Sequence, residues 1–214
     1  MKQATARLPF ELIRELDRAG IDAAFLLRNC RELILCGSRT VRGRKDSDWD
    51  IVAIGHDIPR RKRGLIDLIP IDQDSVLSPQ WVESELASHI KYHGVWLKGE
   101  PGPWVAKVAI TSKTLSTKAQ RLRYRLNLME RSWELLSPVA RSRYLKLLRR
   151  DLQRFNLLAH GAPVPPSPIL DADWEISSNR LGEKGYLEAL LPRLPDDLQQ
   201  NVREWIAHVQ FHVS

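Results

Sequence analysis

The sequence has few cysteines, no long apolar run, and no internal repeat or low-complexity segment. Its two cysteines, Cys30 and Cys36, are too few and too close together for a disulfide framework or a metal cage. We expect Cys36 to be a small core residue rather than a nucleophile. No segment approaches the ~18 consecutive apolar residues of a membrane span, and the N-terminal segment lacks the apolar core of a secretory signal. We therefore expect a cytoplasmic protein with no membrane segment.

What the sequence does contain is an ordinary globular composition with an excess of positive charge. Of its 214 residues, 43% are hydrophobic and 28% are charged, which excludes wholesale disorder. This length provides enough core for one large domain or two small ones. The formal net charge of +7 favours acidic partners such as phosphate, nucleotide or nucleic acid.

The N-terminal half alternates between short β-rich runs and helical segments. The predicted strands are Leu33–Cys36, Ile51–Ile54, Leu65–Ile71 and Val95–Leu97, and the predicted helices cover 9–29 and 79–92. Ser78 and Pro79 open the second helix as its cap and its first-turn proline. We interpret the basic run Arg60–Arg63 as a solvated hairpin turn. The alternation predicts an α/β or α+β domain with a mixed sheet.

A change in composition after this half predicts a second domain. The segment 98–103 contains two glycines and two prolines, and we interpret it as a linker. Beyond it, apolar residues recur at steps of three and four, as in helices that bury one face. The clearest stripes are Leu122, Leu126, Met129, Trp133 and Leu136, then Leu145, Leu148, Leu152 and Phe155, with weaker helical patterns at 180–191 and 195–212 after a proline-rich loop at 161–168. We expect a first domain over 1–103 and an all-α helical bundle over 104–214.

The residues after the first predicted strand indicate a phosphate-binding turn. The strand ends at Gly37, where the absence of a side chain lets the backbone turn tightly and approach a ligand. Ser38 then stands at an expected helix N-terminus, where free amide groups favour an anion. The basic residues Arg39, Arg42 and Lys45 follow closely in the sequence.

Three aspartates nearby predict a metal site. Asp48 and Asp50 stand two positions apart at the start of the second predicted strand, so their side chains point to the same face. The two carboxylates repel unless a cation lies between them, and Mg²⁺ binds carboxylate oxygens together with substrate phosphates. Asp67 is the one charge in an apolar strand, so we expect it to have a metal or a donor partner. We interpret the following Asp72 and Asp74 as loop acids.

The spacing of these residues resembles that of a known family. Gly37 and Ser38, nine further residues, and then Asp48-x-Asp50 are similar to the glycine–serine and Asp-x-Asp motif of the polymerase-β nucleotidyltransferase superfamily. Asp67 matches the later strand acid of that family. The sequence looks most like the minimal nucleotidyltransferases and the antibiotic nucleotidyltransferases, which add a helical C-terminal domain.

The resemblance extends over residues 20–100. Ser47, directly before the first aspartate, and the segment His93–Glu100 also fit the family pattern. Trp49 departs from it, because the family often has a smaller aliphatic residue there. We expect Trp49 to be tolerated because its side chain faces away from the metal site.

The resemblance implies a polymerase-β-like fold and a reaction. The reaction is transfer of a nucleoside monophosphate from an NTP, with ATP as the expected nucleotide, to an acceptor hydroxyl with release of pyrophosphate. Asp48 and Asp50 would hold two Mg²⁺ ions, and Asp67 would bind the ion at the acceptor or take the acceptor's proton. The implied nucleotide-binding residues, which would grip the phosphates and neutralise the leaving pyrophosphate, are Gly37, Ser38, Arg39, Arg42 and Lys45.

The helical half carries most of the positive charge. Between residues 104 and 160 there are thirteen basic residues and three acidic ones. The basic helices over 107–154 favour RNA or another acidic partner as the acceptor, and the alternative is a solvated helix face. An aminoglycoside is a polycation and suits this segment poorly.

Other functions are also compatible with the sequence. One is a catalytically silent protein of the same fold, such as an antitoxin of a toxin–antitoxin pair or a regulatory partner. Another is an antibiotic-modifying adenylyltransferase. Arg154 and His160 are spaced as in the Arg-x(4–6)-His motif of HEPN ribonucleases, and the alternative for them is a structural or surface role.

Overall fold

The computed structural model describes residues 8–41 and 46–211. The chain divides into two compact units, and an α+β unit is followed by a helical one, as the sequence predicts. The first unit comprises Met1–Ala109 and Pro165–Pro168, and the second comprises Ile110–Val164 and Ile169–Ser214. The first division therefore falls after Ala109 and not after residue 103.

The first unit contains short helices and strands that alternate along the chain. Its helices are α1 (Phe10–Arg18), α2 (Ala23–Asn29), α3 (Pro79–Val82), α4 (Glu85–His93) and α5 (Trp104–Lys107). Its strands are β1 (Cys30–Cys36), β2 (Trp49–Gly55), β3 (Arg61–Arg63), β4 (Ile66–Asp72) and β5 (Val95–Lys98). The four predicted strands are confirmed as β1, β2, β4 and β5, whereas β3 occupies the basic run that was expected to be a turn.

The strands form one mixed sheet in the order β3-β4-β2-β1-β5. β2 and β4 are parallel, and the other neighbours are antiparallel. In this register Asp50 lies opposite Cys36 of β1 on one side and opposite Asp67 of β4 on the other. The sheet thus brings the end of β1 next to the acidic starts of β2 and β4.

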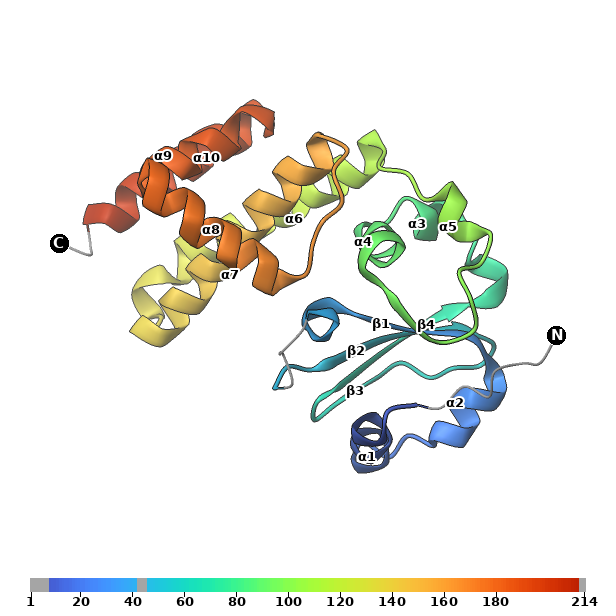
Figure 1. Cartoon of the computed structure of the whole chain (residues 1–214). Coiled ribbons are helices and arrows are strands. Elements are labelled where there is room, and N and C mark those ends of the chain that lie inside the picture. The colour runs from blue at the N-terminus through green and yellow to red at the C-terminus, as the bar shows by residue number, and fades with distance from the viewer. Residues whose placement is uncertain (1–7, 42–45, 212–214) are drawn as a thin grey trace. The chain divides into compact units, whose positions relative to one another are not determined.

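Helices cover both faces of the sheet (Figure 1). On one face, α1 and α2 pack against a core that includes Leu16 and Ile51. On the other face, α3, α4 and α5 pack against a core that includes Ile54, Ile90 and Trp104. Successive residues of β2 belong alternately to the two cores, because neighbouring side chains of a strand point to opposite faces.

Both cysteines are free and buried in β1, as expected for small core residues. Burial raises the pKa of Cys30 to about 11. Burial, followed by the charges of Asp50 and Asp67, raises the pKa of Cys36 to about 12. Neither thiol has the depressed pKa of a nucleophile.

The predicted linker at 98–103 is instead packed into the first unit. A Cβ on Gly102 would lie 2.5 Å from Oε1 of Glu32, a carboxylate buried in β1. The indole N–H groups of Trp96 and Trp104 donate to Oε2 of this carboxylate over 3.0 and 3.2 Å. Trp104 is fully buried and packs edge-to-face on Trp81. These contacts explain why the first unit continues past the glycine–proline segment.

The second unit is a set of amphipathic helices. They are α6 (Ser112–Ser132), α7 (Pro138–Ala159), α8 (Ser167–Leu181), α9 (Glu183–Leu190) and α10 (Asp196–Phe211). The two predicted apolar stripes lie on α6 and α7 and continue into the turn after α6, and most of their members are buried in one core, including Leu122, Met129, Leu152 and Phe155. No helix in the described part of the chain has the length and apolar character that a membrane span requires.

Two predicted helices are interrupted in the first unit. The helix expected over 9–29 breaks at Gly20, whose φ of +72° is left-handed and ends α1. The helix expected from Pro79 begins there, with Ser78 at its cap position, but stops after one turn. Ser84 then starts α4 by accepting a hydrogen bond from the amide of Ala87.

Candidate functional site

The predicted phosphate-binding turn is packed directly on Asp50. Gly37 has a φ of +74°, and a Cβ built on it would lie 2.2 Å from Oδ2 of Asp50. Glycine is therefore required by the backbone conformation and by the surroundings. Residues Gly37–Thr40 form a 3₁₀ turn and not the expected α-helix, so Ser38, which is half-buried, does not have a helix dipole behind it.

The amide of Gly37 has a partner that the sequence did not predict. It donates a hydrogen bond to Nε2 of His89 on α4, with a distance of 3.2 Å between the two nitrogens. A phosphate oxygen that accepted from this amide would replace the imidazole nitrogen. The two residues are 52 positions apart, so no local pattern signals the contact.

The structure brings Asp50 and Asp67 side by side. They are direct partners in the β2–β4 register. Both alternate along their strands with residues of the core under α1 and α2, so both face the α3–α5 side. Asp48 directly precedes β2 and is exposed. Trp49 is buried in the core on the opposite face, which confirms that its side chain points away from the acids.

The electrostatic state of Asp50 reflects this crowding. Burial, followed by the negative charges of Asp67 and Asp48, raises the pKa of Asp50 to about 6, although Lys62 and Arg60 act in the opposite direction. A bound cation would favour the ionised form, because an opposite charge close to a carboxyl lowers its pKa. Asp50 is thus a carboxylate whose charge is costly until a cation neutralises it.

Asp67 already has cationic partners within the chain. Nη1 of Arg60 lies 2.5 Å from its Oδ1, in an ion pair without hydrogen-bond geometry, and Nζ of Lys62 lies 3.3 Å from its Oδ2. The Asp67 side chain is only 14% exposed. The sequence predicted a metal or a donor partner for this acid, and the donors come from the basic run, which forms β3 and the residue before it.

These contacts decide how well the acids fit a metal. Within residues 8–41 and 46–211, Asp48, Asp50 and Asp67 do not form a group whose ligand atoms all lie within 4.8 Å of one another. Asp48 and Asp50 can ligate a divalent cation, whereas both oxygens of Asp67 face cationic side chains. The three predicted ligands are therefore not gathered around one point in the described structure, and the third of them, Asp67, is ion-paired.

A different group does meet that spacing. His56, Asp72 and Asp74 each offer a ligand atom, and these atoms lie within 4.8 Å of one another. All three side chains are exposed, and Oδ1 of Asp72 accepts a 2.8 Å hydrogen bond from the amide of Asp74. Asp72 is the last residue of β4 and caps the turn that follows, so of the two predicted loop acids only Asp74 lies in the turn itself.

The predicted basic phosphate ligands are only partly described. Nε of Arg39 donates to the carbonyl oxygen of Ser47 over 2.6 Å, and its guanidinium lies 4.0 Å from the centroid of the Trp49 ring. Arg39 therefore links the 3₁₀ turn to the start of β2. Arg42 and Lys45 lie outside the described residues.

Most basic residues of the helical unit are ion-paired within it. The pairs are Lys118, Arg125 and Arg154 with Asp151, Arg123 with Asp197, Arg141 with Glu134, Lys146 and Arg150 with Asp171, and Arg149 with Glu183. The other members of the predicted basic set, Lys107, Lys113, Arg121, Arg131 and Arg143, are exposed and form no ion pair with another described residue. The charge available to an acidic partner is thus smaller than the sequence suggested.

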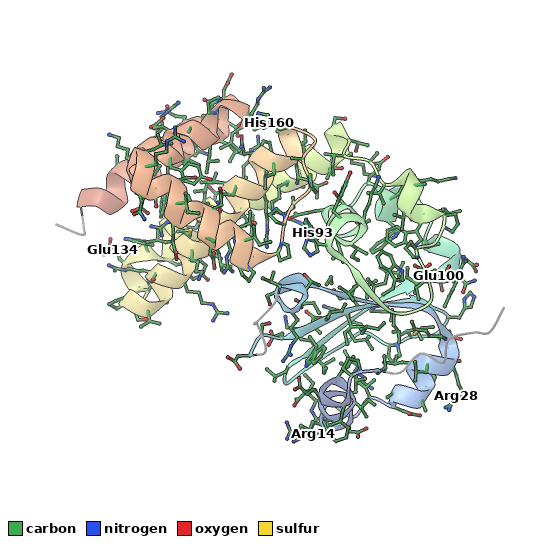
Figure 2. All side chains as sticks on the ribbon, viewed as in Figure 1. Arg14, Arg28, His93, Glu100, Glu134 and His160 are labelled. Carbon is green, nitrogen blue, oxygen red and sulfur yellow. The ribbon has the colours of Figure 1, made fainter. Side chains whose placement is uncertain are left out.

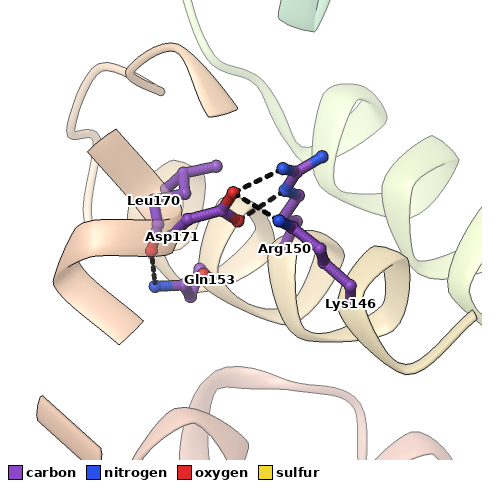
Figure 3. Close-up of polar contacts among 5 residues, drawn as sticks. All are labelled: Lys146, Arg150, Gln153, Leu170 and Asp171. Atoms are coloured by element: carbon purple, nitrogen blue, oxygen red, sulfur yellow. Dashed lines mark hydrogen bonds and ion pairs between the residues drawn. The ribbon is translucent and has the colours of Figure 1, made fainter. Parts of the chain in front are cut away.

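Asp171 shows how these pairs join helices (Figure 3). Its carboxylate accepts two hydrogen bonds from Arg150, of 2.7 and 2.6 Å, and lies 3.0 Å from Nζ of Lys146. Burial acts to raise the pKa of Asp171, but the bonds from Arg150 and Lys146 outweigh it and lower the pKa. Gln153 donates to the carbonyl oxygen of Leu170 over 3.0 Å. Lys146 and Arg150 therefore fasten α7 to α8.

The Arg154 and His160 pair does not form one site. Arg154 is half-buried and pairs with Asp151 at 3.6 Å. His160 is exposed at the C-terminal end of α7 (Figure 2), and its Nδ1 lies 2.8 Å from the carbonyl oxygen of Asn156. Six residues turn an α-helix by about 240°, so the two side chains leave α7 in different directions.

No protein-family model and no curated protein matches the chain. The evidence for its function therefore lies in its own residues, above all in Gly37 against Asp50 and in Asp50 beside Asp67.

Proposed function

We propose that this chain is a Mg²⁺-dependent nucleotidyltransferase of the polymerase-β type, which transfers a nucleoside monophosphate from an NTP to an acceptor hydroxyl and releases pyrophosphate. The observation that best supports it is the packing of the Gly37 turn on Asp50. A turn with an amide donor thus adjoins carboxylates that attract a divalent cation. NTP chemistry requires this combination, since phosphates need both donors and positive charge.

Each residue of the site has a role in this proposal. Asp48 and Asp50 hold Mg²⁺, which when bound supplies positive charge to the phosphates of the NTP. The amide of Gly37 and the hydroxyl of Ser38 donate to phosphate oxygens, with ATP as the expected nucleotide. Arg39 fixes the turn relative to β2 through the carbonyl oxygen of Ser47.

We propose an RNA end as the acceptor, because one face of α6 combines positive charge with an exposed aromatic ring. Lys113, Arg121 and Arg131 fall within an arc of about 80° on this helix. Tyr124, which is 71% exposed, and Leu128 occupy the same arc. Basic side chains bind the nucleic-acid backbone, and an exposed aromatic ring can stack on a base.

A transfer assay tests the proposed reaction. The chain is incubated with each α-labelled NTP, Mg²⁺ and cell extract, and the labelled fraction is identified. Asp50→Asn should lower labelling at least ~tenfold, a loss of about 1.4 kcal/mol in transition-state stabilisation. The matched control is Glu11→Gln on α1, which changes an exposed acid and should leave labelling unchanged. An Asp50→Asn protein that keeps most of the labelling would contradict the metal assignment.

One observation favours a second candidate, a catalytically silent protein that binds nucleotide. Arg60 and Lys62 each pair with one oxygen of Asp67, so both oxygens of this acid are already occupied by cationic groups of the chain. Equilibrium dialysis with Mg²⁺-ATP separates the two candidates. Binding without any labelled product in the transfer assay supports the silent protein, whereas binding with labelled product supports the enzyme.

A further inference from the structure

The edge strand β3 brings two cations to the third acid of the site. Lys62 lies opposite Asp67 in the β3–β4 register, and its Nζ is 3.3 Å from Oδ2. Arg60, directly before β3, reaches Oδ1 at 2.5 Å and also donates to the carbonyl oxygen of Leu68 over 2.8 Å. Each carboxylate oxygen of Asp67 thus has its own positively charged group.

The three side chains of this arrangement differ in their exposure to solvent. Asp67 is 14% exposed, whereas Arg60 is 50% and Lys62 is 72% exposed. The two cations therefore reach from the solvent side to a mostly buried carboxylate. An ion that approached Asp67 from water would have to displace charged groups that repel it.

The charges of the site favour one divalent ion over two. Asp67 is matched by Arg60 and Lys62, which leaves Asp48 and Asp50 as the acids without an ion pair to another described residue. Together the site has three carboxylates and two side-chain cations, so one divalent ion changes its net charge from −1 to +1, and a second ion would raise it to +3.

We propose that Arg60 and Lys62 take the place of a second divalent ion at Asp67, so that the site holds one ion, bound by Asp48 and Asp50. This inference specifies how many metal ions the proposed nucleotidyltransferase binds, and it rests on that proposed function. Asp67 then acts as a positioning residue that holds β3 against the site. It does not serve as a metal ligand or as the acceptor's base.

Titration with Mn²⁺, followed by electron paramagnetic resonance of the free ion, counts the sites directly. All proteins carry Asp74→Asn, which removes one group from the His56 cluster so that this cluster does not add to the count. The starting protein should bind one Mn²⁺ per chain with measurable affinity. Arg60→Gln with Lys62→Gln should bind a second Mn²⁺, with the second dissociation constant at least tenfold lower than in the starting protein.

The chain offers a matched control on the same strand. Arg61 and Arg63 alternate with Lys62 and are exposed, so their side chains point to the opposite face. Arg61→Gln with Arg63→Gln removes the same charge and should still bind one Mn²⁺. The single variant Arg60→Lys keeps the charge and should also bind one, and circular dichroism melts confirm that each protein is folded.

The outcomes distinguish this inference from the proposed function. Two Mn²⁺ ions of similar affinity in the starting protein, or a single ion in the Arg60→Gln, Lys62→Gln protein, would overturn the inference and leave the nucleotidyltransferase proposal standing. No Mn²⁺ binding with or without a non-hydrolysable ATP analogue would overturn both.

Discussion

At the scale of single residues, the carboxyl of Asp50 links the candidate site to the stability of the fold. Because its pKa is about 6, the folded protein keeps a proton on this carboxyl at pH values between ~4 and ~6, where the unfolded chain has already released it. Stability from this group is present at acidic pH and is lost as the pH rises from ~4 to ~6, since the unfolded value is ~3.9. Above this range the folded protein carries an unfavourable buried charge.

Replacing this carboxyl by an amide should therefore stabilise the metal-free protein. We expect Asp50→Asn to raise the melting temperature by ~2–4 °C at about pH 7.5, with the gain largely gone at about pH 4. Saturating Mg²⁺ should raise the melting temperature of the wild type and leave that of the variant unchanged. A variant that melts below the wild type at the higher pH would show that Asp50 stabilises the fold by some other contact.

The close approach of Gly37 to Asp50 gives a second prediction at this scale. Gly37→Ala adds a methyl group where Oδ2 of Asp50 lies at 2.2 Å, so the turn must shift. We expect a loss of ~2–4 kcal/mol in the free energy of unfolding, from strain and displacement together. Denaturant unfolding measures this loss.

Gly64 provides the control for the left-handed backbone alone. Its φ is +56°, and a Cβ on it meets nothing within 4 Å. Gly64→Ala should therefore cost only ~1 kcal/mol. Equal losses at Gly37 and Gly64 would mean that the contact with Asp50 adds nothing.

At the scale of elements, the sequence predicts the strands that carry a hydrophobic pattern and misses the one that does not. β1, β2 and β4 have apolar runs that match buried positions, so their existence follows from composition. β3 is three basic residues with no apolar member, and it forms by pairing with the edge of β4. Its partner Asp67 is known only once the register is known.

The contacts of the candidate site also fall into some that the sequence predicts and some that it does not. The pairing of Asp50 with Asp67 could be anticipated, because both are polar residues in apolar strands. The contacts of His89 with Gly37 and of Arg60 with Asp67 could not, because each depends on how separate elements pack. Local spacing predicts the face of a strand, but tertiary packing decides the partner.

The buried ion pairs between α6 and α7 give a prediction at the element scale. Asp151, 6% exposed, receives Lys118 at 2.8 Å and Arg125 at 2.6 Å. Because Lys118 is itself 5% exposed, Asp151→Ala would strand a buried ammonium group. We expect a loss of ~3–5 kcal/mol in the free energy of unfolding.

Denaturant unfolding compares this variant with Asp197→Ala. Asp197 pairs with Arg123 on the surface of the same unit, where both side chains are well exposed. An exposed pair contributes little to stability, so this control should unfold almost as the wild type does. If the two variants lose the same free energy of unfolding, the buried pair of Lys118 with Asp151 contributes no more to stability than the exposed pair does.

At the scale of the whole molecule, the ion pairs limit where the net charge of +7 can act on a partner. Arg125, Lys146 and Arg150 pair with Asp151 or Asp171, so reversing their charge tests folding rather than binding. Arg121 and Arg131 are exposed on α6 and form no ion pair in the described part of the chain. They are the better probes of an acidic partner.

Salt dependence checks the RNA proposal with these probes. Arg121→Gln with Arg131→Gln should weaken binding of a fluorescent single-stranded RNA by ~tenfold and lower the slope of log affinity against log salt by ~1–2. Arg123→Gln with Arg149→Gln removes equal charge from ion-paired positions and should change binding much less. A wild-type affinity that does not vary with salt would exclude RNA as the acceptor.

Because both cysteines are buried in β1, the rate at which they react with a thiol reagent measures how often this part of the chain opens. Each thiol is 2% exposed and stays protonated in the folded protein, so a thiol-specific reagent can modify it only after the sheet opens. The chain has no other cysteine, and both belong to the first unit. The modification rate therefore reports the opening of the first unit and not that of the helical unit. Comparing it with a probe of the whole chain would show whether the two units open in one event or in sequence.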